Sequence, residues 1–509
     1  MFTEQDTAQL LQQGIDIEDV ERQLERVKNS NGWVEVLKPA LPNDGILTLD
    51  TAYVHQILSR YEQNAATEKI VKFVPASGAA SRMFKDLQQY REGNIAEPLP
   101  QAVSYFFEYI GEFAFFQLLK NKMAEDGQNL SELLEKKDYF TLIDYILAEK
   151  GLNYAQMPKG LIFFHQYGDL VRTAFEEHLV EAVEYACDKD KNVHLHFTVS
   201  PEHLEAFENL KNDLVPKYEQ QFGIQFNIEF STQHTSTDTL AFAADSTPFR
   251  TTDGQLVFRP GGHGSLLKNL NDIEADMLFI KNIDNVCLDR YKKDTITYKK
   301  LLIGLLLEFK NQIFRFLNQM ENELLSEEKL EGIARFLHTA FFISLPDAYR
   351  QTSLPEKQAF LFAKLNRPIR VCGMVKREED PGGGPFWVKN PQGDISLQIV
   401  ETSEMNLADE TQKNCLDKSE FFNPVDLVCS LKNYRGKSFE LSDYVDFSRY
   451  FVSEKTQNGT LLKALENPGL WNGAMSDWLT VFVAVPLSTF SPVKTVNDLL
   501  RKEHNCFIA

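Results

Sequence analysis

The sequence lacks the cysteine spacing on which zinc and dithiol redox sites depend. Its six cysteines lie at positions 187, 287, 372, 415, 429 and 506, and no two of them form a C-x-x-C pair. This absence argues against the common zinc and thioredoxin-like motifs. Reduced thiols are typical of cytoplasmic proteins, so we expect a cytoplasmic protein without a disulfide framework.

Long apolar runs and an excess of positive charge are absent as well. The longest apolar run covers residues 301–307, whereas a transmembrane helix needs about 20 apolar residues. The first six residues lack the basic and apolar regions of a signal peptide. The formal net charge of −20 argues against a nucleic acid or an anionic membrane as a partner. A phosphate ligand therefore requires a locally basic pocket.

The length and composition are those of a globular protein with more than one domain. A chain of 509 residues is too long for one ordinary core, and its 38 phenylalanines indicate a well-filled interior. Periodicity and loop signals predict a helical N-terminal cap at 1–66, an α/β core at 67–410 and a C-terminal α/β region at 411–509. We expect helical insertions in the core at about 84–156 and 292–365.

Residues 71–85 form the stretch around which the rest of the chain is organised. A β-branched and aromatic strand is followed by a turn of small residues and a helix start, and the turn and helix start contain Ser77, Gly78, Ala79, Ala80, Ser81, Arg82 and Lys85. Small side chains let backbone N–H groups approach a ligand, and a helix N-terminus favours negative charge. The pattern suits a triphosphate, although α/β domains without a ligand contain it too.

Polar residues recur where later strands end. Strands and helices alternate from 69 to 286, which predicts a mostly parallel sheet with helices on both faces. The loops at the carboxyl ends of such strands are where open α/β sheets bind ligands. Gln233 lies in such a loop, and the pair Asp284 and Asn285 ends a later strand. Lys159 lies in a turn that leads into a strand, and Gly261, Gly262, His263 and Gly264 lie in a turn that enters a helix.

In this order the motifs resemble those of the nucleotide-sugar pyrophosphorylases, most closely the branch that makes UDP-N-acetylhexosamine and UDP-glucose. The family pattern L-x-G-G-x-G-T-R-L is similar to residues 75–83, and P-K-G is matched at 158–160. P-x-G-H-G is matched at 260–264, and weaker similarities run from 373 to 494. The whole chain also resembles an uncharacterised bacterial family that is defined only as a domain of unknown function.

The resemblance implies a Rossmann-like sheet of the nucleotide-diphospho-sugar transferase (GT-A-like) type. It implies transfer of a nucleoside monophosphate from a nucleoside triphosphate, UTP above all, to a sugar-1-phosphate, with release of pyrophosphate. The catalytic cations would be Arg82, Lys159 and Lys494, and Asp284 would bind Mg²⁺. The nucleotide would contact Ser77, Gly78, Ala79, Ala80, Ser81, Lys85, Gln233, Gly261, Gly262, His263 and Gly264. The sugar would contact Asn285, Glu401, Asn423 and Asp426.

Departures from the family pattern leave two other functions open. Ser77 and Ala80 replace family glycines and Ser81 replaces the threonine, and a Cβ at Ala80 is expected to crowd a triphosphate. A protein of the same fold that binds a nucleotide or sugar phosphate without turnover is therefore an alternative. A sugar kinase that uses the same turn is a third, and the product released, pyrophosphate or nucleoside diphosphate, separates it from the first.

Overall fold

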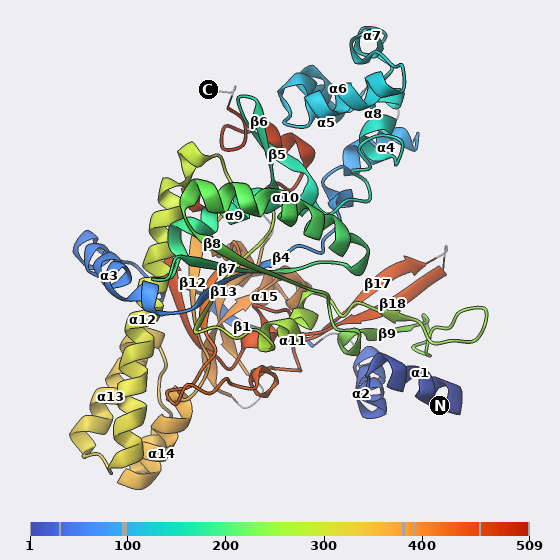
Figure 1. The fold of residues 1–509 in the computed structure, drawn as a ribbon. Coiled ribbons are helices and arrows are strands. Elements are labelled where there is room, and N and C mark those ends of the chain that lie inside the picture. The colour runs from blue at the N-terminus through green and yellow to red at the C-terminus, as the bar shows by residue number, and fades with distance from the viewer. Residues whose placement is uncertain are drawn as a thin grey trace. The chain divides into compact units, whose positions relative to one another are not determined.

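A computed structural model describes residues 2–29, 32–93, 99–378, 382–390, 393–457 and 460–506 (Figure 1). Two compact units share the chain, and each takes three stretches of it. Unit 1 contains Met1–Glu68, Gln233–Phe279 and Leu301–Val485, and unit 2 contains Lys69–Thr232, Ile280–Lys300 and Pro486–Ala509. The boundaries of these units differ from those of the segments 1–66, 67–410 and 411–509 expected from the sequence. That those three segments are domains stays a prediction.

Unit 2 is built on three parallel strands. Strand β4 (Ile70–Pro75) pairs with β7 (Asn192–Thr198), which pairs with β8 (Gln225–Ser231). Helices α9 (Ala174–Tyr185) and α10 (Leu204–Phe222) lie over these strands (Figure 1). Parallel strands require crossover connections, and α10 joins β7 to β8 in this way. The parallel sheet that the sequence predicts is therefore present.

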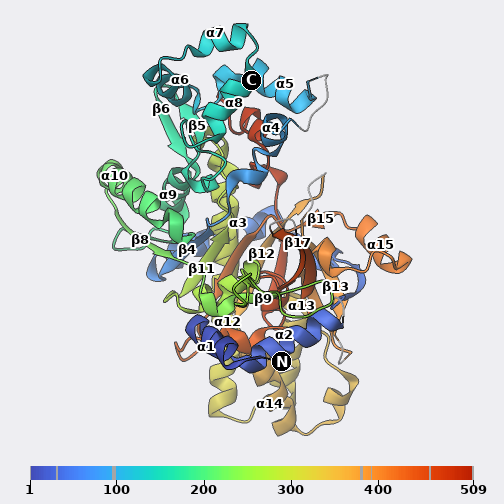
Figure 2. The same ribbon diagram turned by 90° about the vertical axis from the view of Figure 1, so that its right-hand side faces the viewer.

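A helical layer follows the first strand of unit 2, as the sequence predicts. It consists of α4 (Lys85–Arg91), α5 (Gln101–Glu108), α6 (Phe116–Glu125), α7 (Leu130–Glu135) and α8 (Tyr139–Leu147), which lie together in Figure 2. Phe106 and Phe113 have ring centroids 4.8 Å apart, and Phe113 and Phe115 lie 5.0 Å apart. All three side chains are buried, so this aromatic stripe is core. The hairpin of β5 (Phe163–Tyr167) and β6 (Leu170–Thr173) comes next.

Unit 1 contains a further run of strands that is also mostly parallel. Its strand order is β2 (Leu41–Pro42), β3 (Gly45–Leu47), β19 (Leu479–Ala484), β12 (Ile369–Lys376), β16 (Asp426–Ser430) and β11 (Met277–Lys281). The strands from β2 to β12 are parallel, and β16 pairs antiparallel with β12. The protein is thus a mixed α/β structure with mostly parallel sheets. Short β15 (Phe421–Phe422) also pairs with β12.

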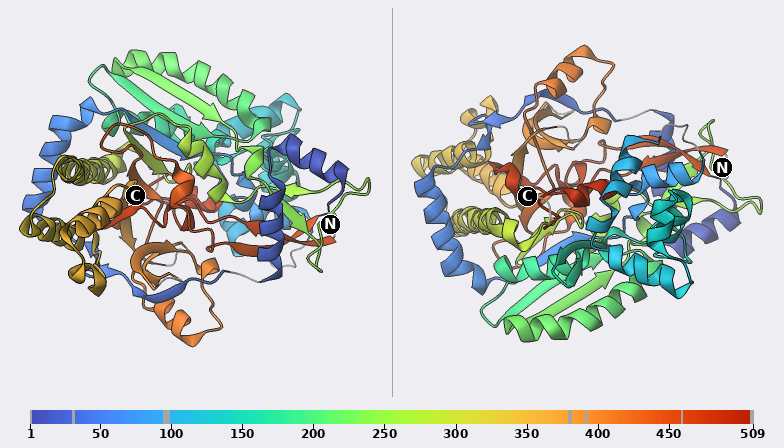
Figure 3. Two further views of the ribbon diagram at one scale, coloured as in Figure 1. Left: turned by 90° about the horizontal axis from the view of Figure 1, so that it is seen from below. Right: turned by 90° about the horizontal axis from the view of Figure 1, so that it is seen from above.

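Two antiparallel sheets complete the strands described in unit 1. One has the order β1 (Glu35–Pro39), β13 (Gly384–Lys389), β14 (Ile395–Val400), and the other β10 (Phe258–Arg259), β9 (Thr239–Phe242), β18 (Thr460–Glu466), β17 (Phe451–Gln457). Helices α1 (Glu4–Gln13) and α2 (Ile17–Lys28) share a hydrophobic cluster with β9 and β18, and Figure 3 shows these dark blue helices beside the red hairpin.

The helices predicted in the N-terminal and middle segments are present, but the strands among them were not predicted. The first 66 residues contain α1, α2 and α3 (Thr51–Asn64), yet β1, β2 and β3 lie between them. Strand β1 pairs with β13, about 350 residues later, so a distant partner decides its structure. The segment 292–365 is helical as expected, with α12 (Lys292–Asn322), α13 (Glu327–Phe341) and α14 (Leu354–Leu365). Helices α11 (Leu266–Asn271) and α15 (Glu410–Asp417) are short.

Candidate functional site

The turn after β4 presents free backbone donors to solvent. Ser77, Gly78 and Ala79 are exposed, and among the described residues no hydrogen-bond acceptor is found for their N–H groups. A Cβ built on Gly78 meets no atom within 4 Å. Successive N–H groups without an internal acceptor are available to bind an anion. Arg82 and Lys85 are also exposed and follow this turn directly.

The concern about Ala80 that the sequence raises is wrong. Ala80 is 0% exposed and belongs to the hydrophobic cluster of unit 2, so its methyl group points into the core. Its N–H donates to the carbonyl oxygen of Met157 at 3.0 Å. The turn does not lead directly into a long helix, as the sequence pattern suggested. A 3₁₀ turn at Ala80–Arg82 comes first, and the α4 helix that follows has only seven residues. The free N–H groups, and not a helix dipole, make this turn suitable for an anion.

Lys159 lies at the turn because the chain around it is bonded to the turn. The N–H of Lys159 donates to the carbonyl of Gly78 at 3.4 Å, and Ala79 and Pro158 form a β-bridge. The Lys159 ammonium donates to Asp284 Oδ2 and to the Val493 carbonyl, each at 2.7 Å. Sequence positions 78, 159, 284 and 493 are therefore brought to one place.

Asp284 is the centre of an ion triad with Lys159 and Lys494. Lys494 Nζ lies 3.3 Å from the same Oδ2 atom, and the N–H of Val493 donates to the Asp284 carbonyl at 3.0 Å. Burial by itself would raise the pKa of Asp284, but the ammonium groups of Lys494 and Lys159 outweigh it and lower that pKa. The carboxylate therefore stays ionised at neutral pH and holds both cations beside the turn.

The residues at this site do not fit a resident Mg²⁺ ion. Within the described ranges no cluster of three or more His, Cys, Asp or Glu side chains is arranged to hold a metal. Asp284 supplies one carboxylate, and two ammonium groups already share its Oδ2 atom. A dication there would be repelled by both, so we derive no step of the chemistry through Mg²⁺. The expected Mg²⁺ requirement stays a prediction.

Asn285 lies next to the triad and contacts the segment that carries Lys494. It is 2% exposed, its Oδ1 atom accepts the N–H of Ser491, and it bridges to Pro492. These contacts fix the segment that carries Lys494. That Asn285 contacts a sugar stays a prediction, because its Nδ2 atom is buried and has no hydrogen-bond partner among the described residues.

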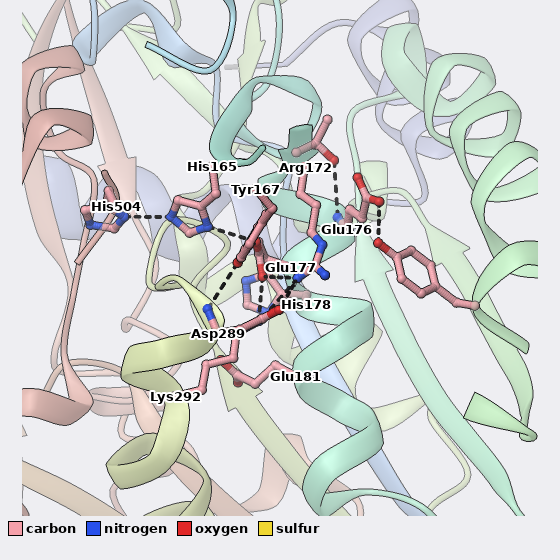
Figure 4. A network of polar contacts seen from close by, with 12 residues as sticks. His165, Tyr167, Arg172, Glu176, Glu177, His178, Glu181, Asp289, Lys292 and His504 are labelled. Carbon is pink, nitrogen blue, oxygen red and sulfur yellow. Dashed lines mark hydrogen bonds and ion pairs between the residues drawn. The ribbon is translucent and has the colours of Figure 1, made fainter. Parts of the chain in front are cut away.

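Helix α9 carries a buried polar face that the sequence analysis did not identify (Figure 4). Its residues Glu176, Glu177, His178 and Glu181 are each at most 4% exposed. His178 Nε2 donates to the carbonyl of Ile283 at 3.1 Å, next to Asp284. A signal was present: three consecutive polar residues and a fourth one turn later lie among the apolar residues of this helix. We interpret this face as the support that positions the triad.

Glu177 and Glu181 each accept hydrogen bonds from several buried side chains, and each forms the centre of a separate cluster. Glu177 accepts from His165 Nδ1 at 2.9 Å, from the Tyr167 hydroxyl at 2.8 Å and from Lys292 at 2.5 Å. His165 Nε2 lies 2.9 Å from Nδ1 of His504, and Figure 4 shows this relay. The cations outweigh burial and hold the pKa of Glu177 well below its usual range.

Glu181 pairs with two buried lysines. Lys72 on β4 lies 3.1 Å from its Oε1 atom and Lys281 on β11 lies 2.6 Å from its Oε2 atom, and each of the three side chains is at most 1% exposed. Burial and the neighbouring cations lower the pKa of Lys72 to about 7, although Glu181 opposes this. One carboxylate thus compensates two ammonium groups.

Because of the lowered pKa of Lys72, we expect the stability of the protein to change with pH above about 7. Between about pH 7 and pH 10 the unfolded chain holds a proton that folded Lys72 releases, so stability rises with pH in this window. The Lys72→Met variant lacks this gain in stability. Its Tm is therefore expected to fall relative to the Tm of the wild type as pH rises from about 7 to about 10. Thermal unfolding at a series of pH values measures this difference. Lys189→Met, at an exposed lysine, should show a constant difference; a constant difference for Lys72→Met would contradict the argument.

In unit 1 the glycine-rich turn packs against the chain's own residues. A Cβ on Gly264 would lie 2.0 Å from the Pro468 carbonyl oxygen, and one on Gly261 would lie 2.7 Å from that of Thr237. Gly262 has a φ of 79°, which favours glycine. These glycines are explained by close packing and backbone conformation, so they give no separate evidence for a nucleotide base. Gln233 donates to Asp238 Oδ1 at 3.0 Å.

His263 and Glu401 are brought together in unit 1. His263 Nε2 lies 3.6 Å from Glu401 Oε1, its ring stacks on Trp471 at 4.3 Å, and its Nδ1 accepts the N–H of Leu470. That N–H identifies the neutral ring with its proton on Nε2. Burial lowers the pKa of His263, against the pull of nearby Glu401 and Glu466. Both side chains are partly exposed, and their contacts with a nucleotide and a sugar stay predictions.

Asn423 and Asp426 lie inside unit 1. Asn423 is 5% exposed, donates to the Gly373 carbonyl and accepts the N–H of Val425. Asp426 is 0% exposed and begins β16. Neither side chain offers surface to a sugar in this structure, and Asn423 holds a turn. Their predicted sugar contacts therefore find no support here.

The chain belongs to the family described as "Domain of unknown function (DUF4301)", whose model matches residues 3–505. A comparison with curated proteins found no match in sequence. None of the helices within the described residues has the length and apolar character needed to cross a membrane.

Solved structures with a similar arrangement are pyrophosphorylases of low sequence identity. The uridine diphosphate N-acetylglucosamine pyrophosphorylase of Trypanosoma brucei has a TM-score of 0.49 and 12% identity over 98% of this chain and 79% of that one. The UDP-glucose pyrophosphorylase of Leishmania major has a TM-score of 0.45 and 13% identity, with the same coverage. Because both TM-scores lie below 0.5, we draw no conclusion from these likenesses.

Proposed function

We propose that this member of the DUF4301 family is a nucleotidyltransferase. It transfers a nucleoside monophosphate from a nucleoside triphosphate, with UTP the first candidate, to a sugar-1-phosphate. The observation that carries the proposal is the triad of Lys159, Asp284 and Lys494 beside the free N–H groups of residues 77–79. In a chain of net charge −20, this is a local concentration of cationic and N–H donors suited to phosphates.

The order of the sequence motifs supports the reaction class. Lys159 and Lys494 are the two lysines that the pyrophosphorylase-like motifs single out, and they share one carboxylate although 334 positions separate Lys159 from its acceptor at Val493. Two lysines from separate motifs of the same resemblance thus contact one carboxylate oxygen. If Lys159 and Lys494 were only surface charges, their contact with the same carboxylate oxygen would have no explanation.

The proposed reaction needs only positioning and charge neutralisation from these residues. An oxygen of the sugar-1-phosphate attacks the α-phosphorus, a new P–O bond forms, and the bond to the β-phosphate breaks as pyrophosphate leaves. The N–H groups of the turn and Arg82 hold the triphosphate, while Lys159 and Lys494 neutralise the charge that develops on the phosphoryl oxygens. Asp284 keeps the two ammonium groups in place before the substrate arrives.

Pyrophosphate release tests the proposal directly. The full chain is mixed with one nucleoside triphosphate at a time and a pool of sugar-1-phosphates, with Mg²⁺ and with a chelator. Release that requires both substrates is the expected result, and division of the pool then identifies the sugar. Binding of a nucleotide without release from any mixture would favour the non-catalytic binding protein. Release of a nucleoside diphosphate would favour a kinase.

Lys494 is expected to contribute strongly to turnover. Its side chain is half exposed, so Lys494→Met should leave the fold intact, and the loss of one charged phosphate contact should lower kcat/KM by at least about tenfold. Lys502→Met is the matched control, because that exposed lysine of the same segment pairs only loosely with Glu503 at 4.0 Å. Equal activity of the two variants would remove Lys494 from the site.

A further inference from the structure

The C-terminal segment of unit 2 ends in a mostly buried stretch that the proposed transferase does not use. The segment carries Lys494, and its residues 503–505 are held by other parts of the same unit. The N–H of Leu288 donates to the first carbonyl of this stretch at 2.9 Å, and Arg290 donates to the last one at 3.0 Å. We call residues 503–505 the latch, because they fasten the end of a segment that contributes a lysine to the candidate site.

His504, the middle residue of the latch, contacts a second buried imidazole. Its Nδ1 atom lies 2.9 Å from Nε2 of His165, and the two side chains belong to residues that are 2% and 0% exposed. Figure 4 shows the two rings side by side at one end of the polar network. The other ring nitrogen of His165 lies 2.9 Å from Glu177. A carboxylate only accepts, so neutral His165 carries its proton there and accepts through Nε2. His504 therefore supplies the one proton that lies between the rings.

The charges around the pair do not favour a second proton. Burial, His165 and Arg501 hold the pKa of His504 well below its usual range, against the pull of Glu177. Glu177 already compensates Lys292, which lies 2.5 Å from its Oε2 atom, so it does not offset two further positive charges. The titratable and charged side chains that face the pair or its carboxylate are Tyr167, Arg172, Glu177, Asp289, Lys292 and Arg501.

We propose that His165 and His504 form an acid-sensitive fastening that releases the latch when both imidazoles are protonated. With one proton between the rings, the two nitrogens are held by a hydrogen bond. With a proton on each, two N–H groups and two positive charges face each other at 2.9 Å, and the contact breaks. A released His504 titrates at its ordinary pKa of about 6.5. Below about pH 6.5 the open form therefore binds protons that the closed form does not, and the closed form loses stability as pH falls.

Hydrogen exchange of the full chain between about pH 7.5 and about pH 5 tests the proposal. The exchange is followed by mass spectrometry and corrected for the intrinsic rate at each pH. The N–H groups of Leu288, His504 and Asn505 report on the latch, because their hydrogen bonds involve it. We expect their protection to fall by at least about tenfold over this range, while strand β7 stays protected. Unchanged protection of the latch, or an equal loss in β7, would overturn the proposal.

A matched pair of variants assigns the titration. Glutamine in His504→Gln keeps a neutral donor but does not titrate, so the protection of its latch should not depend on pH in this range. His203→Gln, at a histidine directly before α10 in the same unit, should keep the pH dependence of the wild type. The same pH dependence in His504→Gln as in the wild type would contradict the proposal. Should His504→Gln not fold, the exchange profile of the wild type still decides.

An effect of the latch on turnover rests on the proposed function, because it acts through Lys494 on the same segment. We expect pyrophosphate release to fall with the protection of the latch in the wild type and less so in His504→Gln. Hydrogen exchange does not depend on the reaction. Loss of latch protection in a protein that releases no pyrophosphate therefore supports the latch and contradicts only the transferase.

Discussion

Replacing Asp284 by asparagine is expected to lower pyrophosphate release by at least about 100-fold. The two ammonium groups that meet at Oδ2 would lose their shared charge partner, and a hydrogen bond to a charged group contributes about 1.5–3 kcal/mol. Steady-state kinetics with both substrates measures the loss. Asp190→Asn, at an exposed position in unit 2, is the matched control. Undiminished activity of Asp284→Asn would remove this residue from the mechanism.

The same variant distinguishes two roles of Asp284. If the carboxylate anchors Lys159 and Lys494, the variant should bind a nucleoside triphosphate in the presence of a chelator at least as tightly as the wild type does, because both ammonium groups are released to the phosphates. If the carboxylate instead binds Mg²⁺, the variant should differ from the wild type only when Mg²⁺ is present. The geometry favours the anchoring role, since both lysines already contact Oδ2.

Replacing Glu181 by glutamine is expected to lower the free energy of unfolding by about 3–5 kcal/mol. The substitution leaves Lys72 and Lys281 buried without a negative partner, and an uncompensated buried charge is costly. Urea denaturation followed by circular dichroism measures the change. Glu184→Gln lies on the same helix at an exposed position and should change stability little. A loss below about 1 kcal/mol for Glu181→Gln would show that the lysines find other compensation.

Lys72 offers an internal check on this second prediction. If the penalty in Glu181→Gln arises from unpaired ammonium groups, adding Lys72→Met should restore part of the lost stability, because one buried charge is removed. If the penalty arises from lost packing of helix α9, the second substitution should add to it. The two side chains are in contact, so non-additivity is the expected outcome.

Local patterns in the sequence were sufficient for many of the helices and strands, and the order of the motifs was sufficient for the cations of the candidate site. The strand at 70–75, its turn of small residues, the helices of 84–156 and those of 292–365 follow from propensity and periodicity, which act over a few residues. Lys159, Asp284 and Lys494 were identified from motif order, and the structure brings them together. Strand β1 escaped prediction because its partner, β13, is distant in sequence.

Only the tertiary structure decided which of these residues face solvent and which face the core. The methyl group of Ala80 points into the hydrophobic cluster, Asn285 holds the segment of Lys494, and Asn423 and Asp426 are buried. The acidic residues of α9 are buried although their residue type favours exposure, because cations from β4, β11 and α12 compensate them there. The sequence by itself determined the order of elements and the candidate charges. Burial and charge pairing depend on residues far apart in the chain, so only folding brings those partners together.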